Sequence, residues 1–199
     1  MNGAIDLSNK IGEIVEASTG RFTAQCYELH QPPPFGSLVK TRCGHIEIYA
    51  VVSGAATASI EAGRRPVARG REEEVEEDIF SANPQLDKLL RTDFDGLVVG
   101  HRDGDKLNHY LPPQPAKIHS FVFLCEPDEV AAFNQSLDYL SILIYAEHQA
   151  DELIAASLRH AATTREDSRD FLVRAGKELA SLLADDTSRL NTILRRIRR

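Results

Sequence analysis

Apolar and polar positions alternate along much of the first 125 residues, as in strands that bury one face. In Arg21–Leu29, for example, Phe22, Ala24 and Cys26 share one face. The same alternation or β-branched character predicts further strands at Ile11–Ala17, Ser37–Arg42, His45–Ser59, Leu97–His101 and Ile118–Leu124. Gly54 and several alanines in the longest run indicate a bulge or sharp bend. Five or six short strands separated by Gly and Pro predict a small closed β-barrel rather than a sandwich.

The pattern changes near residue 125, after which apolar residues recur every three or four positions and Gly and Pro become rare. Glu126-Pro127-Asp128-Glu129 is a helix-start signal. The later apolar stripes run through Val130, Phe133, Leu137, Leu140 and Ile144, then Leu153, Ile154, Leu158 and Ala161, then Phe171, Ala175, Leu179 and Leu182, and finally Leu190, Ile193, Leu194 and Ile197. We therefore predict an α+β fold, with a β domain over residues 8–125 and an all-helical extension over residues 126–199.

A charged segment over residues 64–95 interrupts the strands. Its first part contains four arginines followed by six acidic residues: Arg64, Arg65, Arg69 and Arg71, then Glu72, Glu73, Glu74, Glu76, Glu77 and Asp78. Val75 and Ile79, four residues apart, predict a helix there. Asn83-Pro84 starts a second short helix, in which we expect Leu86, Leu89 and Leu90 to be buried. We interpret this segment as a helical insertion whose arginines neutralise the acidic helix beside them.

The composition is that of an ordinary globular domain: 42% of the 199 residues are hydrophobic and 27% are charged, enough to bury a sizeable core. A net charge of -7 argues against nucleic-acid binding by bulk charge. Cys26, Cys43 and Cys125 form no CxxC motif, so we expect reduced, mostly buried thiols and a cytoplasmic location. The longest apolar run, Leu140–Ala146, is too short to span a membrane, and the first ten residues lack a signal-peptide core.

The motifs of common nucleotide and hydrolase sites are missing from the sequence. It contains no GxxxxGK[ST] segment, no GxGxxG after a strand and no GxSxG. We therefore expect no ATP binding, no cofactor and no enzyme activity. One alternative stays open, because His101, Asp103, Asp105 and His109 lie within nine residues and could hold a divalent transition metal. In the other interpretation, Asp103-Gly104 makes a turn and the histidines are solvated.

The C-terminal end is basic. Residues 189–199 contain five arginines and no acidic residue, so the net charge of the other 188 residues is -12. Arg195, Arg196, Arg198 and Arg199 have no acidic residue near them in the sequence. They could bind nucleic acid, an anionic membrane surface or an acidic partner, or they could simply complement the C-terminus of a solvated helix.

Three segments of the β domain, Ile11–Thr19, Phe22–Cys26 and Pro34–Lys40, together with the later stretch Ile48–Val52, carry a family-like pattern. Its positions in the three segments are Gly12, Val15, Ser18, Phe22, Gly36 and Val39. The pattern resembles the HAS-barrel, the small N-terminal β-barrel that HerA-type DNA translocases share with the α and β subunits of ATP synthase. The resemblance covers roughly residues 8–125 and is strongest over residues 11–60. It implies a barrel that binds partners or sits beside others in a collar. Motor members carry a RecA-like ATPase after the barrel, whereas helices follow it here, so the resemblance implies the assembly role and not the enzyme activity.

Together these observations predict a non-enzymatic adaptor that associates through its barrel with a HerA-like or ATP-synthase-like ring ATPase, in DNA processing, and that forms a homo-oligomer. The expected partner-binding residues are Phe35, Glu72, Glu73, Glu76 and Glu77, because an acidic helix steers a basic partner. One alternative is a nucleic-acid-binding protein that uses Arg195, Arg196, Arg198 and Arg199. The other is a metal-dependent enzyme at His101, Asp103, Asp105 and His109.

Overall fold

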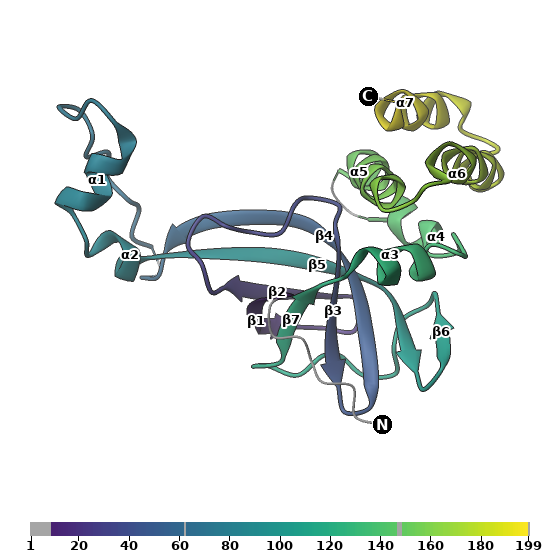
Figure 1. Ribbon diagram of the computed structural model, residues 1–199, viewed down its shortest axis with the longest axis horizontal. Helices are drawn as coiled ribbons and strands as arrows, with labels where there is room; N and C mark the ends of the chain where they lie inside the picture. Colours follow the sequence, from purple (N-terminus) through teal and green to yellow (C-terminus); the bar gives the residue numbers. More distant parts are fainter. Residues whose placement is uncertain (1–8, 62, 147–148, 199) are drawn as a thin grey trace.

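The strands close into an antiparallel barrel (Figure 1). The computed structural model describes residues 9–61, 63–146 and 149–198. The strands are β1 (Lys10–Ala17), β2 (Arg21–Cys26), β3 (Leu38–Cys43), β4 (Ile46–Ser59), β5 (Leu90–Asp103), β6 (Lys106–Asn108) and β7 (Phe121–Leu124). Six of them follow one another in the order β2–β1–β7–β3–β4–β5, β5 pairs with β2 to close the barrel, and β6 forms a hairpin with β5. The α+β class and the closed barrel are confirmed.

The barrel interior is filled by the alternating apolar residues that predicted the strands. Phe22 of β2 and Phe94 of β5 are both buried there, and their rings meet edge to face with centroids 6.5 Å apart. The other main buried side chains are Ile14, Ala24, Cys26, Val39, Ile48, Ala50, Val52, Val98 and Val122. β2 ends at Cys26, three residues earlier than predicted, because Tyr27 and Glu28 turn out into solvent.

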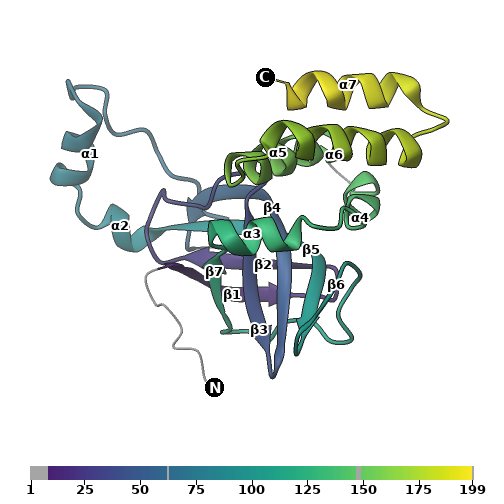
Figure 2. The same cartoon turned by 45° about the vertical axis from the view of Figure 1, so that its right-hand side comes forward.

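A second core lies outside the barrel, where helices cover the outer face of β3, β4 and β5. The helices are α3 (Pro127–Phe133), α4 (Leu140–Ile144), α5 (Ala150–Thr163), α6 (Ser168–Leu182) and α7 (Thr187–Ile197). Leu38, Tyr49, Val51 and Val99 of the barrel share one continuous cluster with the helical side chains. Figure 2 shows α5, α6 and α7 lying above the barrel wall, with α3 between them and the strands. The helical extension therefore packs directly on the barrel.

The helical stripe that begins at Val130 is broken in two. α3 ends at Phe133, and α4 starts only at Leu140. Asn134 stabilises the break, because its amide donates to the carbonyl of Val130 at 2.8 Å and its side-chain oxygen accepts from the Tyr139 hydroxyl at 2.7 Å. Among the described residues, no helix has the length and apolar character needed to cross a membrane.

β4 and β5 are each 14 residues long, and their far ends pair with each other beyond the reach of β3 and, from Leu90 to Thr92, also beyond the reach of β2. This ribbon, Gly54–Ser59 with Leu90–Asp95, carries residues 63–89 at its tip, which we call the arm (Figure 1). The arm contains α1 (Glu76–Ala82) and α2 (Leu86–Leu89), and neither helix buries a residue. The expected full burial of Leu86, Leu89 and Leu90 is wrong: all three are half-buried, because the arm and the start of β5 that carries it lie away from both cores. Residues 90–95, which we expected in the insertion, form the start of β5.

Candidate functional site

The arm carries the predicted acidic residues on an exposed surface. Glu72 and Glu73 precede α1, while Glu76 and Glu77 belong to its first turn, and all four are exposed. Within the described residues the structure shows no ion pair from any of the four. Acidic side chains are favourable near the positive end of a helix, so α1 holds this charge with little cost. The arm therefore presents a localised negative field clear of the barrel.

The contacts that hold the arm are few. The ring of Phe80 in α1 packs edge to face on His30, with centroids 5.8 Å apart, and Arg69 donates to the side-chain oxygen of Asn83 at 3.0 Å. Arg64 forms an ion pair at 2.8 Å with Glu61. We expected these arginines to neutralise the acidic helix, but Arg64 and Arg69 have other partners, which leaves more of the helix charge uncompensated.

Phe35 does not stand free on the barrel surface. It is partly buried against the core that the helices share with the barrel. The neighbouring Gly36 lies against α5 and has a φ of +86°. The position of Phe35 therefore suits a role in joining the barrel to the helices better than direct contact with a partner.

The basic C-terminal helix is partly neutralised. Arg196 forms an ion pair with Glu152 of α5 at 2.6 Å, and its main-chain oxygen accepts from Arg159 at 2.6 Å. The expectation that no nearby acid pairs with these arginines is thus wrong for Arg196, because α7 packs against α5. Arg195 and Arg198 are exposed. The fourth predicted residue, Arg199, lies outside the described residues.

The proposed metal-binding loop does not bring its four residues together. His101 is buried, where its Nδ1 donates to the carbonyl of Tyr110 at 3.1 Å, and Nε2 of His109 donates to the carbonyl of Phe133 at 2.9 Å. Asp103 pairs instead with His45 at 3.4 Å, and Asp105 is exposed. Across the described part of the chain, no three His, Cys, Asp or Glu side chains are placed to hold a metal ion. The histidines therefore act in packing rather than as a ligand set.

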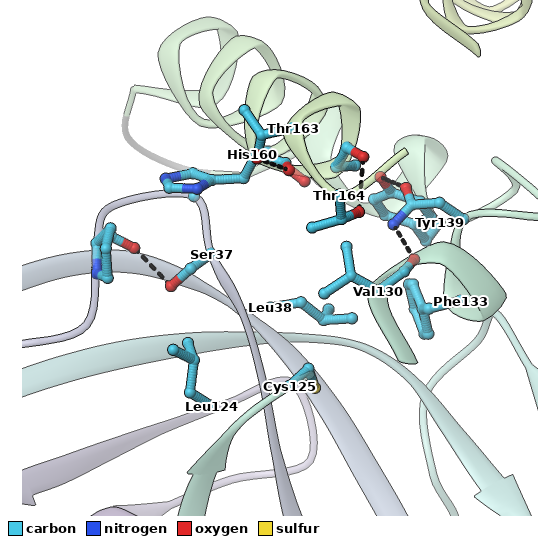
Figure 3. Close-up of a pocket in the computed structure, with 15 residues that line it drawn as sticks. Ser37, Leu38, Leu124, Cys125, Val130, Phe133, Tyr139, His160, Thr163 and Thr164 are labelled. Atoms are coloured by element: carbon cyan, nitrogen blue, oxygen red, sulfur yellow. Dashed lines mark hydrogen bonds between the residues drawn. The ribbon is translucent and has the colours of Figure 1, made fainter. Parts of the chain in front are cut away.

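A cavity of about 160 Å³ lies between the barrel and the helices (Figure 3). It is lined by Ser37, Leu38, Leu124 and Cys125 of the barrel side, Val130, Phe133, Asn134 and Tyr139 near α3 and α4, and Ser157, His160, Thr163 and Thr164 of the α5 region, among others. No sequence signal indicated this cavity, since its residues come from segments far apart in the chain.

Two hydroxyls around the cavity are hydrogen-bonded to main-chain carbonyls, and its thiol and phenol are buried. The hydroxyl of Ser37 donates to the carbonyl of Pro34 at 2.7 Å, and that of Thr164 donates to the carbonyl of Ala161 at 2.9 Å. Burial raises the pKa of the Cys125 thiol well above its ordinary value, and burial raises the pKa of Tyr139 to about 12. Because a reactive cysteine needs a lowered pKa, Cys125 has the character of an inert core thiol.

A polar cluster fastens the barrel to α3. The buried hydroxyl of Tyr49 donates to Glu47 at 3.2 Å and accepts from Nε of Arg102 at 3.2 Å, and Lys40 forms an ion pair with Glu129 in the first turn of α3. Burial raises the pKa of Tyr49 to about 12. Opposite charges are paired throughout this cluster, so its arrangement suits structural support rather than proton transfer.

No protein-family model matches the sequence, and the comparison with curated proteins finds no match.

Proposed function

We propose that this protein is a non-catalytic adaptor that binds a partner protein through the acidic arm and the adjoining barrel surface. The observation that carries the proposal is the arm itself. Its two short helices have no fully buried residue, and the β4–β5 ribbon holds them away from the barrel with their acidic side chains exposed. Because the arm adds no residue to either core, we infer that it serves a contact outside the molecule. Its negative field would raise the association rate of a partner with a basic surface.

The proposed partner is a ring-forming ATPase of the HerA-like or ATP-synthase-like kind. The support is the resemblance of residues 11–60 to the HAS-barrel together with the closed six-stranded barrel that these residues help to form. In the proposal, the partner supplies nucleotide hydrolysis, and this chain, in which no P-loop motif occurs, supplies assembly. DNA processing is the proposed setting because HerA-type translocases act on DNA.

Affinity purification from the native cells after nuclease treatment tests this proposal. The wild-type protein is compared with an arm variant in which Glu72, Glu73, Glu76 and Glu77 are all changed to Gln. The control variant removes the same charge from exposed positions elsewhere, by changing Glu16, Glu28 and Glu166 to Gln and Asp185 to Asn. Each exposed charge contributes a few tenths of a kcal/mol, so we expect recovery of a ring ATPase to fall about tenfold for the arm variant only.

Two results would contradict the proposal. If the wild-type protein recovers no ring ATPase, the proposed partner is wrong. If the wild-type protein and the arm variant recover equal amounts of the ring ATPase, the acidic residues of the arm do not take part in binding.

A further inference from the structure

The last part of β4 has a neighbouring strand on one side only. β3 pairs with β4 over Ile46–Val51, whereas β5 pairs with β4 as far as Ser59. Within the described residues, Gly54–Ser59 therefore has β5 along one edge and no strand along the other. An open strand edge of this kind presents unpaired main-chain groups to any extended chain that approaches it.

The register fixes which main-chain groups face the open edge. The N–H of Val98 donates to the carbonyl of Gly20, at 2.9 Å, so in this part of β5 alternate residues face β2 and those between them face β4. The residues that face β4 are Arg91, Asp93 and Asp95, and their partners are Ala58, Ala56 and Gly54. It follows that Ala55, Thr57 and Ser59 direct their N–H and C=O groups toward the open edge.

The side chains on this stretch leave the edge accessible. All four residues from Ala55 to Ala58 are exposed, and none carries a large side chain. Glycine and alanine are poor strand formers, so pairing with β5 rather than intrinsic preference holds this stretch extended. A strand built in this way lets another backbone approach closely.

Two carboxylates of β5, those of Asp95 and Asp93, lie one strand in from the open edge, in the register of Gly54 and Ala56. Asp95 Oδ1 accepts from the hydroxyl of Thr23 at 2.7 Å, and a Cβ at Gly54 would lie 3.8 Å from Asp95 Oδ2, so this oxygen leans over β4. Asp93 Oδ2 pairs with Arg91 at 2.9 Å, but Asp93 Oδ1 is shielded from solvent and has no hydrogen-bond partner among the described residues. Asp95 Oδ2 is therefore the carboxylate oxygen that a side chain crossing over Gly54 would meet.

We propose that this open edge of β4 binds an extended basic segment of the partner protein as an additional β-strand. Main-chain hydrogen bonds to Ala55, Thr57 and Ser59 would hold the segment, and a lysine or arginine side chain could cross over Gly54 toward Asp95. Between Glu61 and Asp95 the chain has ten acidic and six basic residues, a net charge of -4, which favours a basic segment. The inference rests on the proposed function, since it assigns the surface and the chemistry of the partner.

Amide hydrogen exchange by NMR tests the geometry in the full-length protein. In the free protein we expect the amides of Ala55 and Thr57 to exchange fast and those of Ala56 and Ala58 to be protected. The probe is a capped ten-residue peptide of alternating lysine and valine, with a peptide of alternating glutamate and valine as its control. The lysine peptide should slow exchange at Ala55 and Thr57 at least tenfold, and the glutamate peptide should not.

A matched pair of variants tests the same hydrogen bonds. Ala55→Pro removes an N–H that the ladder with β5 does not use, whereas Ala55→Val keeps it. We expect Ala55→Pro to abolish binding of the lysine peptide, Ala55→Val to retain it, and Asp95→Asn to weaken it about threefold, as for an exposed charge. Circular dichroism of both Ala55 variants checks that they fold.

The outcomes separate the two proposals. Unchanged exchange at Ala55 and Thr57 in the presence of both the lysine peptide and the recovered partner would overturn the edge proposal. It would leave the adaptor proposal standing if the arm variant still loses the partner. Protection by the lysine peptide without recovery of any ring ATPase would support the edge and contradict the proposed partner.

Discussion

Replacing Gly36 by alanine tests how closely the loop before β3 packs on α5. Gly36 has a φ of +86°, and a Cβ there would lie 2.6 Å from Ala156 Cβ and 2.7 Å from the main-chain N of Ser157. The left-handed conformation costs an alanine about 1 kcal/mol. Displacing the loop from the helix adds about 1–3 kcal/mol, as in other overpacked sites. We expect Gly36→Ala to lower the free energy of unfolding by about 2–4 kcal/mol.

Gly44→Ala is the matched control. Gly44 has a φ of +63°, but a Cβ added there would meet no atom within 4 Å beyond its chain neighbours, so only the conformational cost of about 1 kcal/mol applies. Urea unfolding followed by circular dichroism measures both variants, and the melting temperature should fall by about 2–4 °C for each kcal/mol. Equal losses for the two variants would refute the close contact between the loop and α5.

Tyr49→Phe removes the buried hydroxyl that bonds Glu47 and Arg102, and it should lower the free energy of unfolding by about 1–2 kcal/mol in urea. Because burial raises the pKa of Tyr49 from 10 to about 12, the folded state holds this proton more tightly. The protonated Tyr49 hydroxyl therefore contributes fully to the free energy of unfolding below pH 10, and this contribution is lost as the pH rises toward 12. Tyr49→Phe should flatten the fall in stability between these pH values. An equally steep fall in the variant would contradict the raised pKa of Tyr49. Ile193→Ala, in a fully buried position of α7, should cost about 2–5 kcal/mol in the same assay, and a cost below about 1 kcal/mol would show that α7 is not docked. Binding to a 20-base-pair duplex should have a log–log salt slope no steeper than about -2, because only Arg195 and Arg198 of the described terminal arginines are exposed, and a slope beyond about -4 would favour the nucleic-acid alternative.

The barrel was predictable because its strands alternate visibly and end at turn residues. β4 was predicted within one residue at its start and to the same residue at its end. The start of β5 was missed, although Thr92 and Phe94 are buried in alternation, because the charged neighbours Arg91, Asp93 and Asp95 made this stretch resemble the acidic insertion. Pairing with both β2 and β4 overrides that local composition.

The site-level errors arise from contacts between distant segments. Arg196 has no acid near it in the sequence, yet α7 packs on α5 and brings Glu152 to it. The four residues of the metal hypothesis are close in sequence, but β-hairpin geometry buries His101 and leaves Asp103 and Asp105 outside. The open edge of β4 follows only from the different lengths of β3 and β5, so no single segment could have indicated it.

The most direct test of the adaptor account is site-specific photo-crosslinking in the native cells. A photoreactive amino acid is placed at Glu77 on the arm, at Ala58 on the open edge, or at Arg195 on the C-terminal helix. The account predicts that the first two positions crosslink to the same ring ATPase, with or without nuclease treatment, and that Arg195 does not. Crosslinks from Arg195 alone, or crosslinks that disappear after nuclease treatment, would contradict it.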